Sequence, residues 1–144
     1  MAIFLDSGFY LGLIHKQDEH HERALGWLQK IRSGSYGQVY TSNLVMAETA
    51  TIMASRTKGN PLAIERTRQL FAGDLQLGTI IRVNEDDEKN AWDLFTKLSK
   101  AKDLISAAGL VSFVDCTIIV LCQAHDIAHI ASFDGHFKSW LKYP

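Results

Sequence analysis

Four acidic side chains stand at positions where folding could gather them into one charged pocket. Asp6 follows the apolar run Ala2–Leu5, and Asp134 follows a second apolar run, HIASF. Glu48 and Asp115 lie in stretches whose patterns indicate helices. In open α/β sheets ligands bind just beyond the carboxyl ends of the strands, so the two strand-end acids can share a crevice if their strands are neighbours.

Several carboxylates in one pocket repel one another and cannot all ionise without compensation. A divalent hard cation provides that compensation, and Mg²⁺ prefers carboxylate oxygens together with several waters, which leaves room for phosphate oxygens. Such an ion can activate a water molecule and stabilise charge on a phosphodiester during in-line attack. The four acids therefore predict a metal site suited to phosphodiester chemistry.

Each acid taken singly also has a simpler interpretation. Asp6 and Asp134 could each cap the turn that follows, and Asp115 could be an ordinary N-cap that satisfies free backbone N–H groups. The run of acids at positions 85–88 is a possible rival site, although acids in a first helical turn also suit the helix dipole. The set of four is therefore more informative than its members.

Glu48 has the weakest simple interpretation because no capping role exists in the middle of a helix. It lies in line with Leu44 and Ile52, one turn before and one turn after it, on a face that is otherwise apolar. A charge buried there without a partner would be strongly disfavoured. We therefore expect Glu48 to be turned toward the other acids.

The elements that must position these acids follow an alternating order. Short apolar, β-branched runs predict strands at Ala2–Leu5, Gln38–Thr41, Thr79–Val83 and Ala128–Phe133. Between them Ser7, then Ser42 or Asn43, can cap helices, and Asn60-Pro61 opens another. The segment LVSFV before Asp115 fits either a short strand or an extended lead-in. Strands separated by helical patterns predict an α/β fold with a parallel sheet.

Length and composition indicate a single globular domain over residues 1–144. The chain is 47% hydrophobic and 22% charged, with a formal net charge of −1, so any nucleic acid would have to bind through a local patch. It shows no positively charged leader and no long apolar span, so we expect a cytoplasmic protein without a membrane partner. Cys116 and Cys122 fall on nearly opposite faces of one helix, which predicts two buried, reduced thiols.

Four motifs occur in an order typical of one known family. They are FLDS at the start, TSNLVMAE in the middle, SFVDCTIIVLCQ late and IASFDGHF near the end. In these motifs the chain resembles the PIN-domain family, and more narrowly the VapC-type toxin ribonucleases. The resemblance implies a three-layer α/β/α fold with a central parallel sheet of four to five short strands. It also implies Mg²⁺- or Mn²⁺-dependent cleavage of single-stranded RNA, a homodimer and, for toxin members, a small antitoxin that blocks the site.

Carried over by motif, the family's acidic positions fall on Asp6, Glu48, Asp115 and Asp134. The resemblance implies that Asp6 and Asp115 are the firmest metal ligands and that Glu48 binds the metal or orients its water. Asp134 would complete the set directly or through a second ion. Ser7 and Ser42 match small hydroxyl positions beside these acids and are expected to donate hydrogen bonds to them.

Candidate RNA contacts form a separate group. Arg56, Lys58, Arg66 and Arg68 are the only local basic cluster, which could equally be a solvated face. If RNA binds there through its backbone, binding should weaken with salt. His136, two residues after Asp134, is either a contact to RNA phosphate or an outer water, or a turn residue that lies near the site.

Other classes of function fit less well. A phosphatase of the haloacid-dehalogenase type needs a second Asp two residues after the first, and a receiver-like domain needs a pair of acids after its first strand. Position 8 is Gly8, and Asp6 stands alone. No GxxxxGKS loop is present. An RNA-processing nuclease without an antitoxin, or a non-catalytic module that binds RNA or protein, stays open.

Overall fold

A computed structural model describes residues 1–144 and contains a four-stranded parallel sheet. The strands are β1 (Ala2–Leu5), β2 (Gln38–Ser42), β3 (Thr79–Ile81) and β6 (His129–Ala131), in the spatial order β3-β2-β1-β6. All three pairings are parallel, with Phe4 opposite both Tyr40 and Ile130. The predicted parallel sheet of four to five short strands is confirmed.

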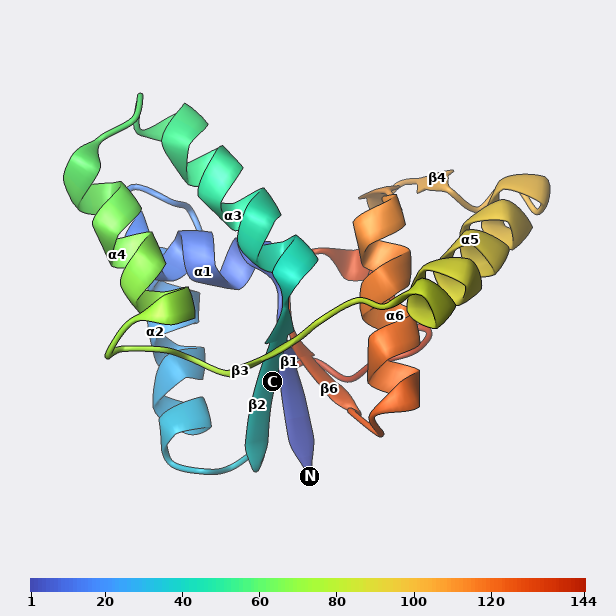
Figure 1. The fold of residues 1–144 in the computed structure, drawn as a ribbon, viewed down its shortest axis with the longest axis horizontal. Coiled ribbons are helices and arrows are strands. Elements are labelled where there is room, and N and C mark those ends of the chain that lie inside the picture. The colour runs from blue at the N-terminus through green and yellow to red at the C-terminus, as the bar shows by residue number, and fades with distance from the viewer.

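Helices cover both faces of the sheet. One layer contains α1 (Ser7–Ile14), α2 (His21–Arg32), α3 (Asn43–Arg56) and α4 (Pro61–Ala72), and the other contains α5 (Glu85–Lys100) and α6 (Phe113–Ala124). Figure 1 shows the sheet nearly edge-on between the two helical layers. The predicted three-layer α/β/α architecture is confirmed.

The core sits on the central strand. All four residues of β1 are buried, and Ile3, Phe4 and Leu5 have no exposed surface. Because β1 is flanked by β2 and β6 and covered on both faces, an unbroken apolar run is what its position requires. Burial of this strand fixes the residue that follows it, Asp6, at the carboxyl edge of the sheet.

The later helix starts follow the signals in the sequence, whereas α1 is capped by Asp6 rather than by Ser7 as predicted. Ser42 caps α3 by accepting a hydrogen bond from the Val45 N–H. Asn60 caps α4, with Pro61 as its first residue, and Asn84 forms a capping box with Asp87 at the start of α5. These caps satisfy N–H groups that a helix cannot pair internally. The acids at positions 85–88 accordingly serve the start of α5.

Two predicted strands are shorter than expected, and one hairpin was not predicted. β3 ends at Ile81 rather than Val83, because the Val83 N–H bonds to the side chain of Asn43 instead of a neighbouring strand. The last strand is β6, His129–Ala131, rather than 128–133. The antiparallel strands β4 (Ile105–Ser106) and β5 (Gly109–Leu110) form a small hairpin that leads into α6.

The two cysteines lie where their spacing predicts. Both thiols are free and buried, and Cys122 belongs to the main core while Cys116 belongs to a smaller cluster between α5 and α6. Burial raises the pKa of Cys122 to about 12. None of the helices has both the length and the apolar character needed to cross a bilayer.

Candidate active site

The acids gather where the connections of the sheet change direction. The chain leaves β1 into α1 on one face, whereas β6 is entered from α6 on the opposite face (Figure 1). β1 and β6 are direct neighbours, so their carboxyl ends frame a topological switch point. In register, Leu5 pairs with Ala131, which places Asp6 beside Ser132.

Asp6 is held on both of its carboxylate oxygens. Its Oδ1 accepts the Ser7 N–H at 2.8 Å, and its Oδ2 accepts the Ser132 hydroxyl at 2.7 Å. The residue is only 2% exposed, and this burial raises the pKa of Asp6 to about 7. The Ser132 hydrogen bond opposes the rise, and the charges of Asp115 and Asp134 add to it. A positive charge beside Asp6 would lower its pKa, and no positively charged side chain acts on this carboxylate.

Ser132 is a site residue that sequence reasoning missed. Besides donating to Asp6, its hydroxyl accepts the Asp134 N–H at 3.1 Å, so one buried side chain ties the two strand-end acids together. The signal lay in the motif IASFD, where a small hydroxyl residue stands two positions before the acid. Parallel register with β1 then places that hydroxyl beside the first acid.

Asp115 is not the N-cap of α6, which corrects the simpler interpretation given above. The cap is Ser112, whose hydroxyl accepts the Asp115 N–H at 3.1 Å while Asp115 Oδ2 accepts the Ser112 N–H at 2.9 Å. This reciprocal capping box fixes the carboxylate in the first turn of α6. Burial raises the pKa of Asp115, and the Ser112 bonds oppose that rise. The spacing Ser-x-x-Asp could have identified Ser112 from the sequence.

Asp134 and His136 complete the part of the site nearest to α6. Asp134 is exposed and begins the short 3₁₀ helix η1 (Gly135–Phe137). One donor atom each of Asp115, Asp134 and His136 lie within 4.8 Å of one another. His136 Nε2 lies 2.9 Å from Asp115 Oδ2, an ion-pair distance, but without the angles of a hydrogen bond. The structure thus brings His136 into the acid cluster itself.

Glu48 reaches the same cluster from α3, although its predicted surroundings were wrong. The fully buried face of α3 carries Val45, Thr49 and Met53, and Glu48 lies half-buried on the flank of that face. Burial raises the pKa of Glu48, the Ser7 side chain lowers it by hydrogen bonding, and the charges of Asp115 and Asp134 raise it further. Ser7 therefore lies between Asp6, which accepts its N–H, and Glu48, whose pKa its side chain lowers.

The donor set has the chemistry of a divalent-cation site. Asp115, Asp134 and His136 offer two carboxylates and one imidazole nitrogen within 4.8 Å of one another. Three acids of the set, Asp6, Glu48 and Asp115, have raised pKa values. Burial is the main cause of those raised pKa values and repulsion between the acids adds to it, and a cation placed among them would offset both. Hard divalent ions take carboxylate oxygens, and imidazole is a common ligand of transition ions.

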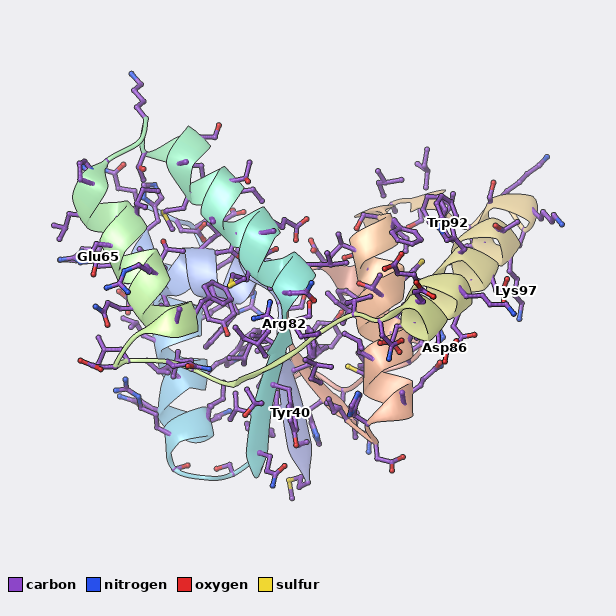
Figure 2. All side chains as sticks on the ribbon, in the orientation of Figure 1. Tyr40, Glu65, Arg82, Asp86, Trp92 and Lys97 are labelled. Carbon is purple, nitrogen blue, oxygen red and sulfur yellow. The ribbon has the colours of Figure 1, made fainter.

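Ser42 and the basic cluster do not join this arrangement. The Ser42 hydroxyl is used as the cap of α3, so it positions Glu48 through the helix rather than by bonding to an acid. Arg56 ends α3, two helical turns beyond Glu48, and pairs with Asp18 at 2.9 Å. Arg68 pairs with Glu65 at 2.6 Å, and Figure 2 shows Glu65 on the outer side of α4. Lys58 and Arg66 have no acid within salt-bridge distance.

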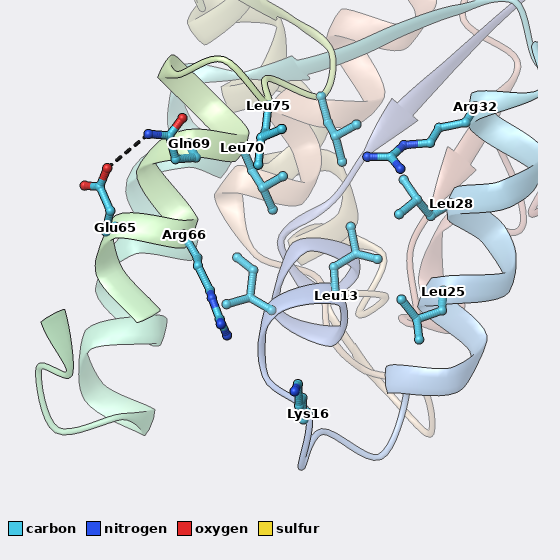
Figure 3. A pocket seen from close by; sticks show the side chains of 12 residues that line it. Leu13, Lys16, Leu25, Leu28, Arg32, Glu65, Arg66, Gln69, Leu70 and Leu75 are labelled. Atoms are coloured by element: carbon cyan, nitrogen blue, oxygen red, sulfur yellow. Dashed lines mark hydrogen bonds between the residues drawn. The ribbon is translucent and has the colours of Figure 1, made fainter. Parts of the chain in front are cut away.

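A separate apolar cavity of about 390 Å³ lies between α1, α2 and α4 (Figure 3). Leucines from all three helices line it, among them Leu13, Leu28 and Leu70, and Arg66 and Lys16 stand at its border. None of the four acids contributes to it. The cavity is therefore distinct from the acid cluster.

Comparisons with known proteins agree with this fold. The family model described as "PIN domain" matches residues 3–140, so the chain belongs to the PIN domain family. Among solved structures, it is similar to VapC20 of Mycobacterium tuberculosis, described as a sarcin–ricin loop cleaving toxin. That match has 25% sequence identity and a TM-score of 0.72, and covers 95% of this chain and 93% of that chain.

A second solved structure is VapBC2 from Rickettsia felis, bound to a DNA fragment from its promoter. The match has 17% identity and a TM-score of 0.67, and covers 100% of this chain and 98% of that chain, which shows a shared fold. A search of curated proteins found no match. The resemblance stated from the four sequence motifs is confirmed at the level of the family.

Proposed function

We propose that this chain is a metal-dependent endoribonuclease that cleaves RNA at the acid cluster of Asp6, Glu48, Asp115 and Asp134. The observation that carries the proposal is the convergence of these acids at the β1/β6 switch point, where three of them have raised pKa values. Membership of the PIN domain family supports a nuclease, and the similarity to an RNA-cleaving toxin supports RNA as the substrate.

We assign each residue a role according to the hydrogen bonds that hold its side chain. A bound Mg²⁺ or Mn²⁺ supplies activation of water and stabilisation of charge on the phosphodiester. Asp6 and Asp115 are the ligands with fixed orientation, because Ser7, Ser132 and Ser112 bond to their oxygens. Such supporting bonds orient ligands and tune the site.

Glu48 and Asp134 lie nearer to solvent than the two fixed ligands. Glu48 is half-buried with a raised pKa, so its carboxylate is suited to accept a proton from the attacking water. Asp134 is exposed, so it can complete the metal shell while substrate phosphate approaches. In this scheme RNA phosphates outside the acid cluster contact Lys58 and Arg66. The other two basic residues, Arg56 and Arg68, are paired with acids.

The decisive experiment is an RNA cleavage assay on the purified chain with a single-stranded and a structured RNA. We expect cleavage with Mg²⁺ or Mn²⁺, its loss on chelation, and a loss of about 100-fold or more in Asp6→Asn. Asp86→Asn is the matched control, because Asp86 lies exposed on α5, away from the sheet edge (Figure 2). Undiminished cleavage by Asp6→Asn would refute the assignment.

We further propose that the nuclease acts as the toxin of a toxin–antitoxin pair and forms a homodimer. The similarity to VapC20 and to VapBC2 supports the first part. For the second part, Ile105 and Leu110 of the β4–β5 hairpin are 76% and 59% exposed and supply apolar surface for such a contact. If an RNA-processing nuclease is correct instead, no small protein encoded beside this chain will bind it and block cleavage.

A further inference from the structure

We propose that His136 is a nitrogen ligand of the divalent ion, so that the site is a mixed nitrogen–oxygen site that prefers Mn²⁺ to Mg²⁺. This inference rests on the proposed function only in requiring that an ion binds at the acid pocket. The juxtaposition that carries it is a buried imidazole without a hydrogen-bond partner, aimed at two carboxylates.

His136 is buried without satisfying either ring nitrogen. Its side chain is 7% exposed, and neither Nδ1 nor Nε2 makes a hydrogen bond within the chain. Leaving a buried polar group unpaired loses its hydration without replacement, so native structures seldom leave one without a partner. Nε2 faces Asp115 Oδ2 at 2.9 Å but is misaligned for a hydrogen bond with it. The imidazole is thus positioned beside the acids without being bonded to them.

The polar groups around the same turn are already engaged. Ser132 bonds to Asp6 and to the Asp134 N–H, and the Tyr143 hydroxyl donates to the Asp134 carbonyl and accepts the Phe137 N–H. The ring of Phe137 lies beside the imidazole, with centroids 4.8 Å apart. These groups therefore make no hydrogen bond to the imidazole, and its Nε2 stays directed at the carboxylate of Asp115.

The spacing of the donors suits one shared ion. Donor atoms of Asp115, Asp134 and His136 lie within 4.8 Å of one another. Two ligands bound at about 2.0–2.1 Å on opposite sides of an ion are about 4.2 Å apart, so a small side-chain rotation closes the set. Oxygen donors suit both Mg²⁺ and Mn²⁺, whereas imidazole binds transition ions better than it binds Mg²⁺. Exchanging one oxygen for nitrogen should therefore move the preference toward Mn²⁺.

The test measures metal binding and does not depend on RNA cleavage. Electron spin echo spectroscopy of the Mn²⁺-loaded chain should show coupling to a directly bound ¹⁴N nucleus, and His136→Ala should lose it. His125→Ala is the control, since His125 is exposed at the other end of α6. Calorimetry should show that His136→Asp, which restores an all-oxygen set, lowers the ratio of Mn²⁺ to Mg²⁺ affinity about tenfold or more.

The outcomes separate this inference from the proposed function. Mn²⁺ bound by the unchanged chain without nitrogen coupling would overturn the role of His136 and leave the nuclease proposal intact. This reading needs no variant, so misfolding of His136→Ala cannot obscure it. Nitrogen coupling in a chain that cleaves no RNA would support the inference and refute the nuclease. Failure to bind Mn²⁺ or Mg²⁺ at all would refute both.

Discussion

The two halves of the acid pocket are built in different ways. In the first half, Asp6 is 2% exposed, and both of its carboxylate oxygens accept hydrogen bonds from Ser7 and Ser132. In the second half, the carboxylate of Asp134 is exposed and the imidazole of His136 has no hydrogen-bond partner. The first half is complete within the chain, whereas the second half has donor atoms that only a further group can satisfy.

The difference follows from the elements that carry each half. Asp6 is held in place by the β1–β6 ladder, including its own N–H bond to the Ala131 carbonyl at 3.1 Å. The second half depends on a helix cap, a three-residue 3₁₀ turn and the Tyr143 hydroxyl. We infer that the first half supplies a fixed anchor and that the second half determines which ligand is accepted.

The largest expected effect lies in the first half and concerns stability against pH. The pKa of Asp6 rises from 3.8 in an ordinary environment to about 7 when folded, so between these values the folded state holds a proton that the unfolded state releases. Stability of the metal-free chain therefore falls as pH rises from about 4 to 7. At pH 8 the ionisation of Asp6 lowers the stability of the folded chain by on the order of 4 kcal/mol relative to low pH. Asp6→Asn should remove this loss.

Urea unfolding of the metal-free chain at pH 5 and pH 8 measures the effect. Glu48 and Asp115 also have raised pKa values, so Asp6→Asn should reduce the loss of stability with pH without abolishing it. The exposed control Asp86→Asn should leave the slope as it is. An equal slope in Asp6→Asn and the unchanged chain would show that Asp6 is ionised at little cost when folded.

A smaller effect is expected at the residue that joins the halves. Ser132→Ala removes the hydroxyl between Asp6 Oδ2 and the Asp134 N–H, so one carboxylate loses its orientation and one amide loses its partner. We expect Mn²⁺ affinity to fall about 10- to 100-fold, as for other residues that orient metal ligands. Calorimetry checks this, with the exposed Ser139→Ala as control. Unchanged affinity would mean that the halves are held independently.

The smallest effect is expected in the second half, at Tyr143. Tyr143→Phe removes a hydroxyl that donates to the Asp134 carbonyl and accepts the Phe137 N–H. The cost should be about 1 kcal/mol, the net value of a typical hydrogen bond, with Mn²⁺ affinity reduced several-fold because the turn loosens. Tyr36→Phe is the matched control, since the Tyr36 hydroxyl makes no hydrogen bond. A loss as large as that of Ser132→Ala would contradict the proposed order.

The sequence predicted the first half better than the second. An apolar run that ends in an acid identifies a strand end, and parallel pairing then brings Asp6 and Asp134 to one edge. Ser132 escaped notice because only the register of β1 against β6 shows that its hydroxyl lies beside Asp6. His136 was singled out as lying near the site, but no spacing in the sequence indicates that its ring turns inward to Asp115.

Other differences have local physical causes. The sequence argument placed Glu48 on a buried apolar line, whereas the buried face of α3 carries Thr49 and Glu48 lies half-buried beside it. Its role as a metal ligand stays a prediction. The β4–β5 hairpin went unpredicted because two-residue strands are too short to show an alternating pattern. The basic cluster was compact in sequence, but pairing of Arg56 and Arg68 with acids removes half of its free charge.

In the capping box of α6, one carboxylate oxygen makes two interactions. Asp115 Oδ2 secures the backbone of Ser112 and also faces His136. Loss of the Ser112 hydroxyl would remove the partner of the Asp115 N–H, which should loosen the helix start and with it the orientation of the Asp115 carboxylate. A screen for altered metal choice should therefore include the helix start as well as the acid cluster.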